Sequence, residues 1–259
     1  MKKEVHIIYH PSYELDYPTA GCECPPRVTS IMNTLSKKYP VFEPETCSED
    51  DILLCHTKRL LESEKNSDHR RHEIACLAAG GAILAAEKAT EGILPFAVIR
   101  PPGHHASNDS NWGFCFYNNI AISLRVLQRD GLIRTGAILD IDLHFGDGSD
   151  NIFIDDDSIN VLNIQSGYSE EFIKETKDGL NSLPNVDILA VSAGFDQYIK
   201  DWGANLSTED YYKVGEIAGR YAKNNCESRI YAILEGGYYI EDLGKNTLSL
   251  IQGMQVGLQ

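Results

Sequence analysis

Short runs of apolar and β-branched residues recur along the chain and alternate with longer stretches of helical periodicity. The runs that predict buried strands are Val5–Ile8, Phe96–Ile99, Ala137–Ile141, Asn160–Ile164, Ile188–Ser192 and Arg229–Leu234. The predicted helices are Glu73–Glu87, Asn119–Arg129 and a segment that begins after Ser207, the expected N-cap. Strands that are apolar throughout and separated by helices are typical of a sheet covered on both faces. The pattern predicts an α/β protein with three layers, α/β/α, and a mostly parallel central sheet.

The predicted elements follow one another without a break that would separate two domains. The sequence has 259 residues, 42% of them apolar, which is enough for one large α/β domain with a sizeable core. The loosest segment is Asp16–Pro26, rich in Pro and Gly, and we expect it to be a surface loop rather than a linker. Residues 1–259 are therefore predicted to form a single domain.

The charge and the cysteines narrow the class of protein. With 23 Lys and Arg against 38 Asp and Glu, the formal net charge is −15. A general nucleic-acid binder needs a basic surface, and a membrane span needs roughly 18 consecutive apolar residues, so neither nucleic acid nor a membrane is an expected partner. The acidic balance is compatible with a cationic partner. The seven cysteines include no CxxC pair, which is typical of reduced thiols and predicts a cytoplasmic protein.

Residues of catalytic type gather at the carboxyl ends of four predicted strands. They are His104 and His105 after the second strand, Asp140, Asp142 and His144 at the third, Asp196 after the fifth, and Tyr238 after the sixth. In open α/β sheets, ligands bind beyond the carboxyl ends of the strands. The convergence of these residues predicts an active site at that edge of the sheet.

The spacing of the acids favours a metal. Asp140, Asp142 and His144 stand at alternate positions, so in extended backbone they would point to one face. Two carboxylates and an imidazole suit a divalent cation, although a solvated acidic loop is the alternative. The adjacent His104 and His105 suggest a proton-transfer pair beside it.

Taken together, five motifs resemble, in order, those of the histone deacetylase family, which includes acetylpolyamine amidohydrolases and acetoin-utilisation proteins. They are Arg-Pro-Pro-Gly-His-His-Ala at 100–106, Gly-Phe-Cys-Phe-Tyr-Asn-Asn at 113–119, Asp-Ile-Asp-Leu-His-Phe-Gly-Asp-Gly at 140–148, Ser-Ala-Gly-Phe-Asp at 192–196 and Glu-Gly-Gly-Tyr at 235–238. The resemblance implies the arginase–deacetylase fold and a short, prokaryotic-type member of the family. The single catalytic domain would then span residues 1–259.

The resemblance also implies a role for each motif residue. One Zn²⁺ would be bound by Asp142, His144 and Asp196. The implied catalytic residues are His105 as general base and acid with its partner Asp147, His104 with its partner Asp140, and Tyr238 as hydrogen-bond donor to the substrate carbonyl. The implied substrate contacts are Gly113, Phe114, Gly236 and Gly237. A structural K⁺ would lie at Asp140 and Asn163, and Arg27 resembles the arginine of the family's internal channel.

The implied reaction is hydrolysis, by metal-activated water, of the amide of an N-acetylated lysine-like or polyamine amine. An oligomer is compatible with the sequence. Two alternatives stay open. One is a binuclear-metal ureohydrolase of the same fold, which would need a DxD pair where Asp196 stands beside Gln197; the other is a non-catalytic acyl-lysine binding module. Only residues 166–185 stand where relatives carry a long rim loop, so we expect a shallow, open entrance.

Overall fold

The structure, a computed structural model, describes residues 3–259, and its centre is one parallel sheet. The seven strands are β1 (Val5–Ile8), β2 (Val41–Phe42), β3 (Leu94–Ala97), β4 (Gly136–Asp140), β5 (Ile159–Asn163), β6 (Ile188–Ala193) and β7 (Ile230–Leu234). Their order is β2-β1-β3-β7-β6-β4-β5, and every neighbouring pair is parallel. The predicted α/β class is confirmed, and the short edge strand β2 is an addition that the sequence did not indicate.

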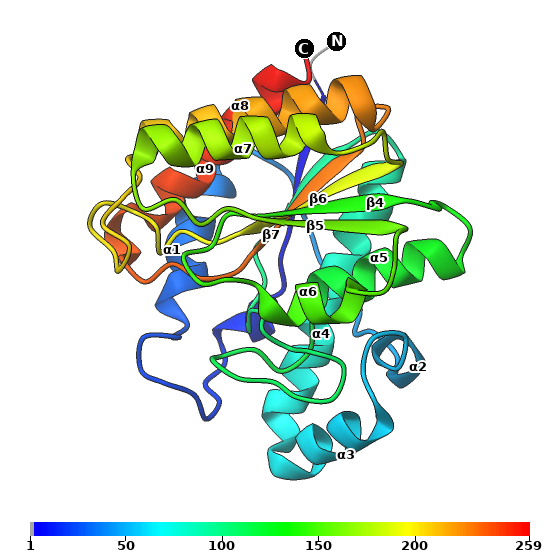
Figure 1. Cartoon of the computed structure of the whole chain (residues 1–259). Coiled ribbons are helices and arrows are strands. Elements are labelled where there is room, and N and C mark those ends of the chain that lie inside the picture. The colour runs from blue at the N-terminus through cyan, green and yellow to red at the C-terminus, as the bar shows by residue number, and fades with distance from the viewer. Residues whose placement is uncertain (1–2) are drawn as a thin grey trace.

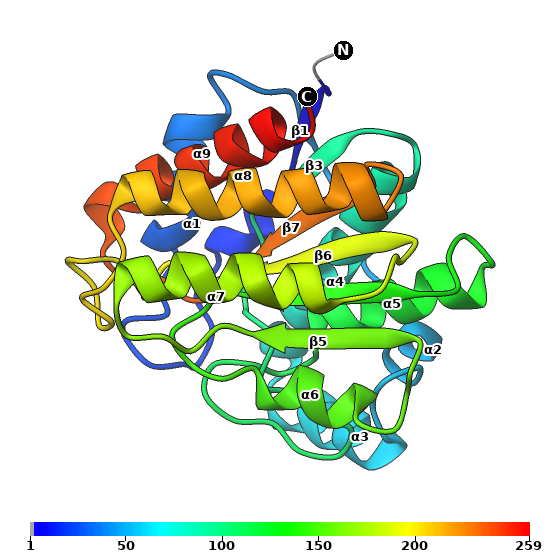
Figure 2. The same cartoon turned by 45° about the horizontal axis from the view of Figure 1, so that its top comes forward.

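Helices cover both faces of this sheet and give the molecule three layers (Figure 1). The helices are α1 (Pro26–Leu35), α2 (Glu49–Ile52), α3 (Lys58–Ser67), α4 (His69–Thr90), α5 (Asn119–Arg129), α6 (Asp147–Phe153), α7 (Ser169–Ser182), α8 (Thr208–Asn225) and α9 (Ile240–Gly257). Helices α7, α8 and α9 lie on one face with α1, and α4, α5 and α6 lie on the other (Figure 2). Among the described helices, none combines the length and the apolar character that crossing a membrane requires.

Local sequence signals account for where several helices begin. Ser207 caps α8 through a capping box with Asp210, as the sequence predicted. Helix α5 has the predicted bounds, and the side chain of Asn118 accepts a hydrogen bond from the backbone of Ala121 at its first turn. The predicted helix Glu73–Glu87 lies inside the longer α4, whose residues are buried nearly all round. The capping residues and the apolar pattern therefore account for where α8, α5 and α4 form.

The segment Asp16–Pro26 is not simply a surface loop, which corrects the expectation from its composition. Tyr17 and Glu23 are buried within it. The Glu23 carboxylate lies 3.0 Å from Arg27 and 2.9 Å from Arg100, and both arginines are fully buried. A buried charge is tolerated only when it is paired and hydrogen-bonded. The loop is thus attached to the core by a buried ionic cluster.

Candidate active site

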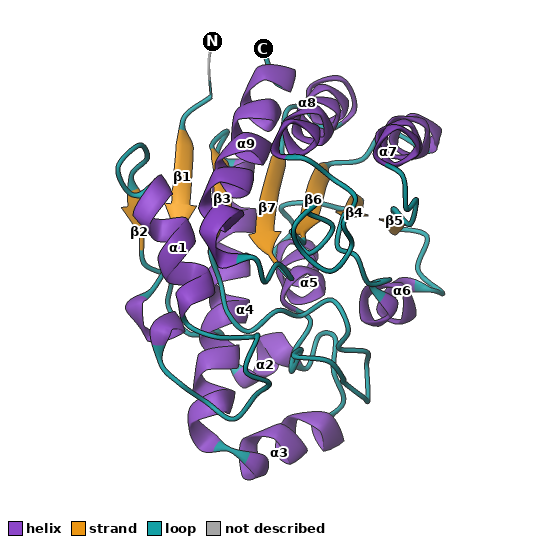
Figure 3. Cartoon of the chain, turned by 90° about the vertical axis from the view of Figure 1, so that its left-hand side faces the viewer, coloured by secondary structure: helices purple, strands orange, loops and turns teal. Residues whose placement is uncertain are grey.

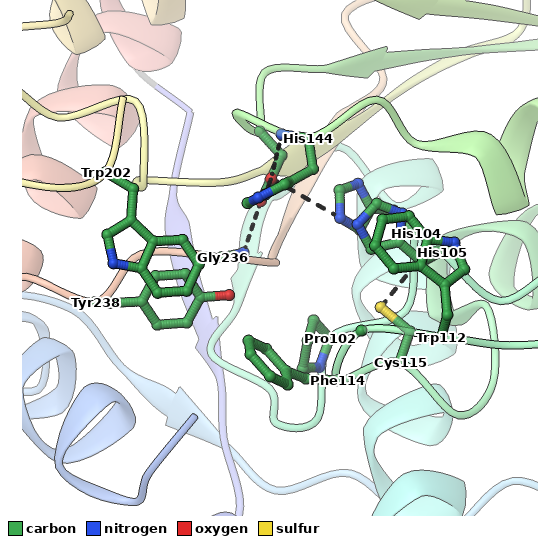
Figure 4. Close-up of a pocket in the computed structure, with 12 residues that line it drawn as sticks. Pro102, His104, His105, Trp112, Phe114, Cys115, His144, Trp202, Gly236 and Tyr238 are labelled. Atoms are coloured by element: carbon green, nitrogen blue, oxygen red, sulfur yellow. Dashed lines mark hydrogen bonds and ion pairs between the residues drawn. The ribbon is translucent and has the colours of Figure 1, made fainter. Parts of the chain in front are cut away.

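The predicted site residues meet beyond the carboxyl ends of four neighbouring strands. Figure 3 shows the strand arrows pointing toward a cluster of loops, and the strands β3, β7, β6 and β4 lie side by side in the sheet. At their ends is a pocket of about 100 Å³ (Figure 4). It is lined by Pro102, His104, His105, Trp112, Gly113, Phe114, Cys115, Asp142, His144, Trp202, Gly236 and Tyr238. The strand order brings motifs together that are far apart in the sequence.

Three of these motif residues form a compact group of metal-ligand type. The ligand atoms of Asp142, His144 and Asp196 all lie within 4.8 Å of one another. His144 Nδ1 is 3.2 Å from Asp142 Oδ1 and 3.0 Å from Asp196 Oδ2. Both carboxylates are buried. The group therefore presents two carboxylates and one imidazole toward a common point.

This group fits a divalent cation. Burial and the neighbouring Asp142 raise the pKa of Asp196 to about 7, which shows the mutual repulsion that a cation would relieve. Asp196 Oδ2 is buried, and among residues 3–259 its near neighbour is His144 Nδ1 at 3.0 Å, an ion-pair contact that gives it no hydrogen bond. A Cβ at Gly236 would lie 2.6 Å from Asp142 Oδ2 and 2.9 Å from Asp196 Oδ2, so glycine leaves the space beside these oxygens open. The donor set suits zinc.

Asp140 does not join this group, contrary to the expectation from its spacing. Strand β4 ends at Asp140, so the alternation of an extended chain stops there. The Asp140 carboxylate instead faces His104 and accepts the backbone N–H of Asp142 at 3.0 Å. Asn163 lies nearby: a Cβ on Gly146 would be 3.2 Å from its Oδ1 and closer still to the Asp140 carboxylate. The two residues expected at a K⁺ site are therefore neighbours.

Two histidines, each paired with an aspartate, stand beside the metal-type group. His104 Nδ1 lies 3.0 Å from Asp140 Oδ2, and His105 Nδ1 lies 2.7 Å from Asp147 Oδ1. A carboxylate at Nδ1 places the proton on that nitrogen and leaves Nε2 as the basic one. Burial alone would lower the pKa of His104, but Asp140 and Asp142 raise it well above its ordinary value. Burial and the charge of His104 lower the pKa of His105 to about 4, so the two neighbouring histidines are shifted in opposite directions.

Tyr238 points its hydroxyl into the pocket (Figure 4). The Trp202 ring stacks on it at 4.1 Å and 24°, and the Arg27 guanidinium carbon lies 4.9 Å from its centroid. Two groups so close to one ring must occupy opposite faces. Burial raises the pKa of Tyr238, which keeps the phenol protonated as a donor. Phe114 meets the ring edge-on at 5.9 Å, across the pocket.

Of the four predicted substrate contacts, three line the pocket and one does not. Gly113, Phe114 and Gly236 are in the lining. Gly237 instead lies behind Tyr238, where its carbonyl accepts a hydrogen bond from Arg27 Nε at 2.6 Å. A Cβ on Gly237 would approach Phe195 to 2.8 Å. This glycine shapes the turn rather than the cavity.

Sequence reasoning missed the two tryptophans of the chain, and both line the pocket. The Trp112 ring lies 3.7 Å from the ring of His105, and its Nε1 donates a 2.8 Å hydrogen bond to Asp147 Oδ2. Trp202 stacks on Tyr238 and meets His144 edge-on at 5.9 Å. Each tryptophan is 52% exposed, so they border the entrance. Their rarity in the sequence was the one available signal.

Buried polar groups hold the histidine loop, the segment from Gly103 to Ser107 that carries His104 and His105, from behind. Glu235 Oε2 accepts the backbone N–H groups of Gly103 at 2.7 Å and His104 at 3.2 Å. On the other side, His56 Nδ1 lies 2.8 Å from the carbonyl of Ser107, and its Nε2 accepts the backbone N–H of Asn118 at 2.9 Å. The side chains of Glu235 and His56 are both buried. The loop is therefore fixed by the core before any substrate arrives.

Residues 166–185, for which we expected a shallow pocket entrance, form mainly a helix. Most of residues 166–185 forms α7, which packs beside α8 in the outer layer (Figure 1). Tyr168 precedes α7 and is exposed. No residue of 166–185 lines the pocket, whereas the exposed Trp112 and Trp202 do. The border of the entrance is thus aromatic and short.

Comparisons with known proteins agree with this architecture. The protein-family model described as Histone deacetylase domain matches residues 21–172 and 184–254 of this chain. Proteins named Probable deacetylase from Methanothermobacter thermautotrophicus and Archaeoglobus fulgidus are 29% and 32% identical, over 96% and 85% of this chain and 90% and 75% of their own lengths. Acetylpolyamine amidohydrolase 1 of Pseudomonas aeruginosa is 31% identical over 62% of this chain and 55% of its own. The crystal structure of the HDA15 HD domain has a TM-score of 0.86 at 20% identity, covering 98% of this chain and 90% of that one. The predicted arginase–deacetylase fold is confirmed.

Proposed function

Since the chain belongs to the histone deacetylase family, we propose that it is a zinc-dependent deacetylase of acetylated lysine-like or polyamine amines. One observation carries the proposal. His104, His105, Asp142, His144 and Tyr238 line a single pocket, and Asp140, Asp147 and Asp196 contact its histidines. Each part supplies something that hydrolysis of an amide requires.

Asp142, His144 and Asp196 would hold one zinc ion, which would polarise the amide carbonyl and acidify the attacking water. The two carboxylates formally cancel the charge of the ion, so a nearby base is needed to complete the activation of the water. His105 fills that role through Nε2, because its Nδ1 proton is committed to Asp147. Asp140 would hold the Nδ1 proton of His104 in the same way, but Asp140 and Asp142 also raise the pKa of His104, which favours a buried positive charge beside the reacting atoms.

The reaction then moves one proton through His105. The water oxygen bonds to the carbonyl carbon while His105 Nε2 accepts a proton, and the negative charge develops on the former carbonyl oxygen. Tyr238 donates its hydroxyl hydrogen bond to that oxygen. His105 passes the proton to the amide nitrogen as the C–N bond breaks, which releases acetate and the free amine.

The pocket favours a short acyl group on a slender, cationic substrate. The pocket is small, about 100 Å³, and is lined by Trp112, Phe114 and Trp202, which suits a short acyl group on a slender chain. The net charge of −15 attracts cationic amines over long range. We propose that the chain acts as one catalytic domain in the cytoplasm, with a structural K⁺ at Asp140 and Asn163.

Hydrolysis of acetyl-lysine peptides and acetylpolyamines, before and after removal of metal by a chelator, tests the proposal. We expect acetate release that disappears on chelation and returns with Zn²⁺. Binding of acetyl-lysine without acetate release would instead indicate a binding module. Release of urea from a guanidino substrate would indicate a ureohydrolase; that alternative is disfavoured because Gln197 follows Asp196.

A further inference from the structure

The loop that follows Asp196 reaches across to the backbone of Tyr238. Asp201 Oδ2 accepts the backbone N–H of Tyr238 at 2.6 Å and that of Tyr239 at 2.7 Å. These N–H groups stand immediately before α9, and the cap residue Tyr239 makes no side-chain cap of its own. A helix leaves its first N–H groups without partners, and an anion there is favourable. Asp201 therefore serves as an external cap that fixes the start of α9.

The next residue of the same loop fixes the Tyr238 ring. Trp202 stacks on its outer face, with 4.1 Å between centroids, and its own backbone N–H is bonded to Asp201 Oδ1 at 2.8 Å. Arg27 supports the inner face and bonds the carbonyl of Gly237. The backbone and the ring of Tyr238 are thus held from one loop, with the buried arginine as a support behind.

Such a restraint has a reason in the sequence before Tyr238. Gly236 and Gly237 precede it, and Gly237 has φ of +119°, a conformation open to glycine but rarely to other residues. A glycine pair gives the tyrosine freedom to turn out of the pocket. A donor must be in place when negative charge develops on the carbonyl oxygen, and a misplacement of about 1 Å can cost roughly a hundredfold in rate.

We propose that Asp201 and Trp202 are positioning residues that hold Tyr238 inward, with its hydroxyl set for the substrate carbonyl. This inference rests on the proposed deacetylase function and deepens it. Asp201 acts through Tyr238, so its contribution to kcat must vanish when the Tyr238 hydroxyl is absent, and the contribution of Trp202, which also meets His144, must fall sharply. A residue that merely stabilises the fold would lower activity whether or not the hydroxyl is present.

A double-mutant cycle on the zinc-loaded protein tests this. Asp201→Ala and Trp202→Ala are each made in the wild type and in Tyr238→Phe, and kcat and KM are measured with an acetyl-lysine substrate. We expect each to lower kcat tenfold to roughly a hundredfold in the wild type, with KM changed less than about threefold for Asp201→Ala. In the Tyr238→Phe background Asp201→Ala should change kcat less than about twofold, and Trp202→Ala, which also removes the edge-on contact with His144, should lose most of its effect.

The chain offers a matched control for the loss of the carboxylate. Asp187 Oδ2 also accepts two consecutive backbone N–H groups, from Arg134 at 2.7 Å and Thr135 at 2.9 Å, at the opposite end of the sheet. Asp187→Ala should lower the Tm and leave kcat within about twofold. The conservative variants Asp201→Asn and Trp202→Phe, which keep an acceptor and a stacking ring, should recover most of the activity and cover the case of an Ala variant that fails to fold.

The outcomes separate the two proposals. If the wild type shows no turnover, the deacetylase function is wrong and the positioning role falls with it. If the wild type is active and Tyr238→Phe is slow, but Asp201→Ala and Trp202→Ala lower kcat equally in both backgrounds or in neither, the positioning role alone is wrong. Equal losses from Asp187→Ala and Asp201→Ala would also overturn it.

Discussion

His56, which holds the histidine loop, makes the unfolding free energy of the protein dependent on pH. It is buried, and burial lowers its pKa from 6.5 to about 4 against the opposing effect of its hydrogen bond to the Ser107 backbone. Between those values the unfolded chain binds a proton that the folded chain does not, so stability is complete above pH 6.5 and falls as the pH decreases toward 4. From pH 7.5 to 5.0, a shift of this size removes about 2 kcal/mol of unfolding free energy.

Urea unfolding of the wild type and of His56→Gln at pH 7.5 and 5.0 measures this contribution. Glutamine keeps an acceptor near the Asn118 N–H but does not titrate, and every other titrating group is common to both proteins. The wild type should be the more stable at pH 7.5, and its advantage should shrink by about 2 kcal/mol at pH 5.0. An advantage of His56 that stays constant between the two pH values would refute the reasoning.

Three further predictions concern the pocket. Tyr238→Phe should lower kcat by roughly 10²–10³ with little change in metal content, and a near-wild-type kcat in steady-state assays would make Tyr238 a packing residue. Trp112→Phe keeps a ring over His105 but loses the hydrogen bond to Asp147, so kcat should fall about tenfold, and Trp112→Leu, which loses both, should fall further. Equal rates for these two variants would argue against the stacking contact. Because no residue of α7 lines the pocket, kcat/KM over a panel of acetyl-lysine peptides should vary less than tenfold, or about 1.4 kcal/mol. A larger spread would show a peptide-binding surface beyond the pocket.

Hydrophobic patterning predicted most of the sheet, and its errors have physical causes. Strand β1 has the predicted bounds. Strand β3 begins and ends two residues earlier than Phe96–Ile99, because Val98 and Ile99 are buried without belonging to the paired strand. Burial, which hydrophobicity reports, and pairing, which defines a strand, are different properties. Strand β2 has two exposed residues, and its sequence therefore carries no burial signal.

The motifs gave the candidate site residues, and the structure shows what a pattern along the chain omits. The spacing of Asp140, Asp142 and His144 was correct for an extended chain, but the strand ends at the first of them. Asp201 and Trp202 belong to none of the five motifs. Asp201 lies 37 positions before Tyr238 in the sequence. Only the arrangement of the loops in space therefore reveals the contacts of Asp201 and Trp202 with Tyr238.

The metal content of the active protein tests the deacetylase proposal most directly. Protein stripped of metal is titrated with Zn²⁺, and bound zinc and acetate release are measured on the same samples, for the wild type and for Asp196→Ala. Activity of the wild type should rise in proportion to bound zinc and reach its maximum at one ion per chain, whereas Asp196→Ala should bind zinc more weakly and release no acetate. Full activity without metal, a requirement for two ions per chain, or unchanged zinc affinity in Asp196→Ala would contradict a single zinc ion held by Asp142, His144 and Asp196.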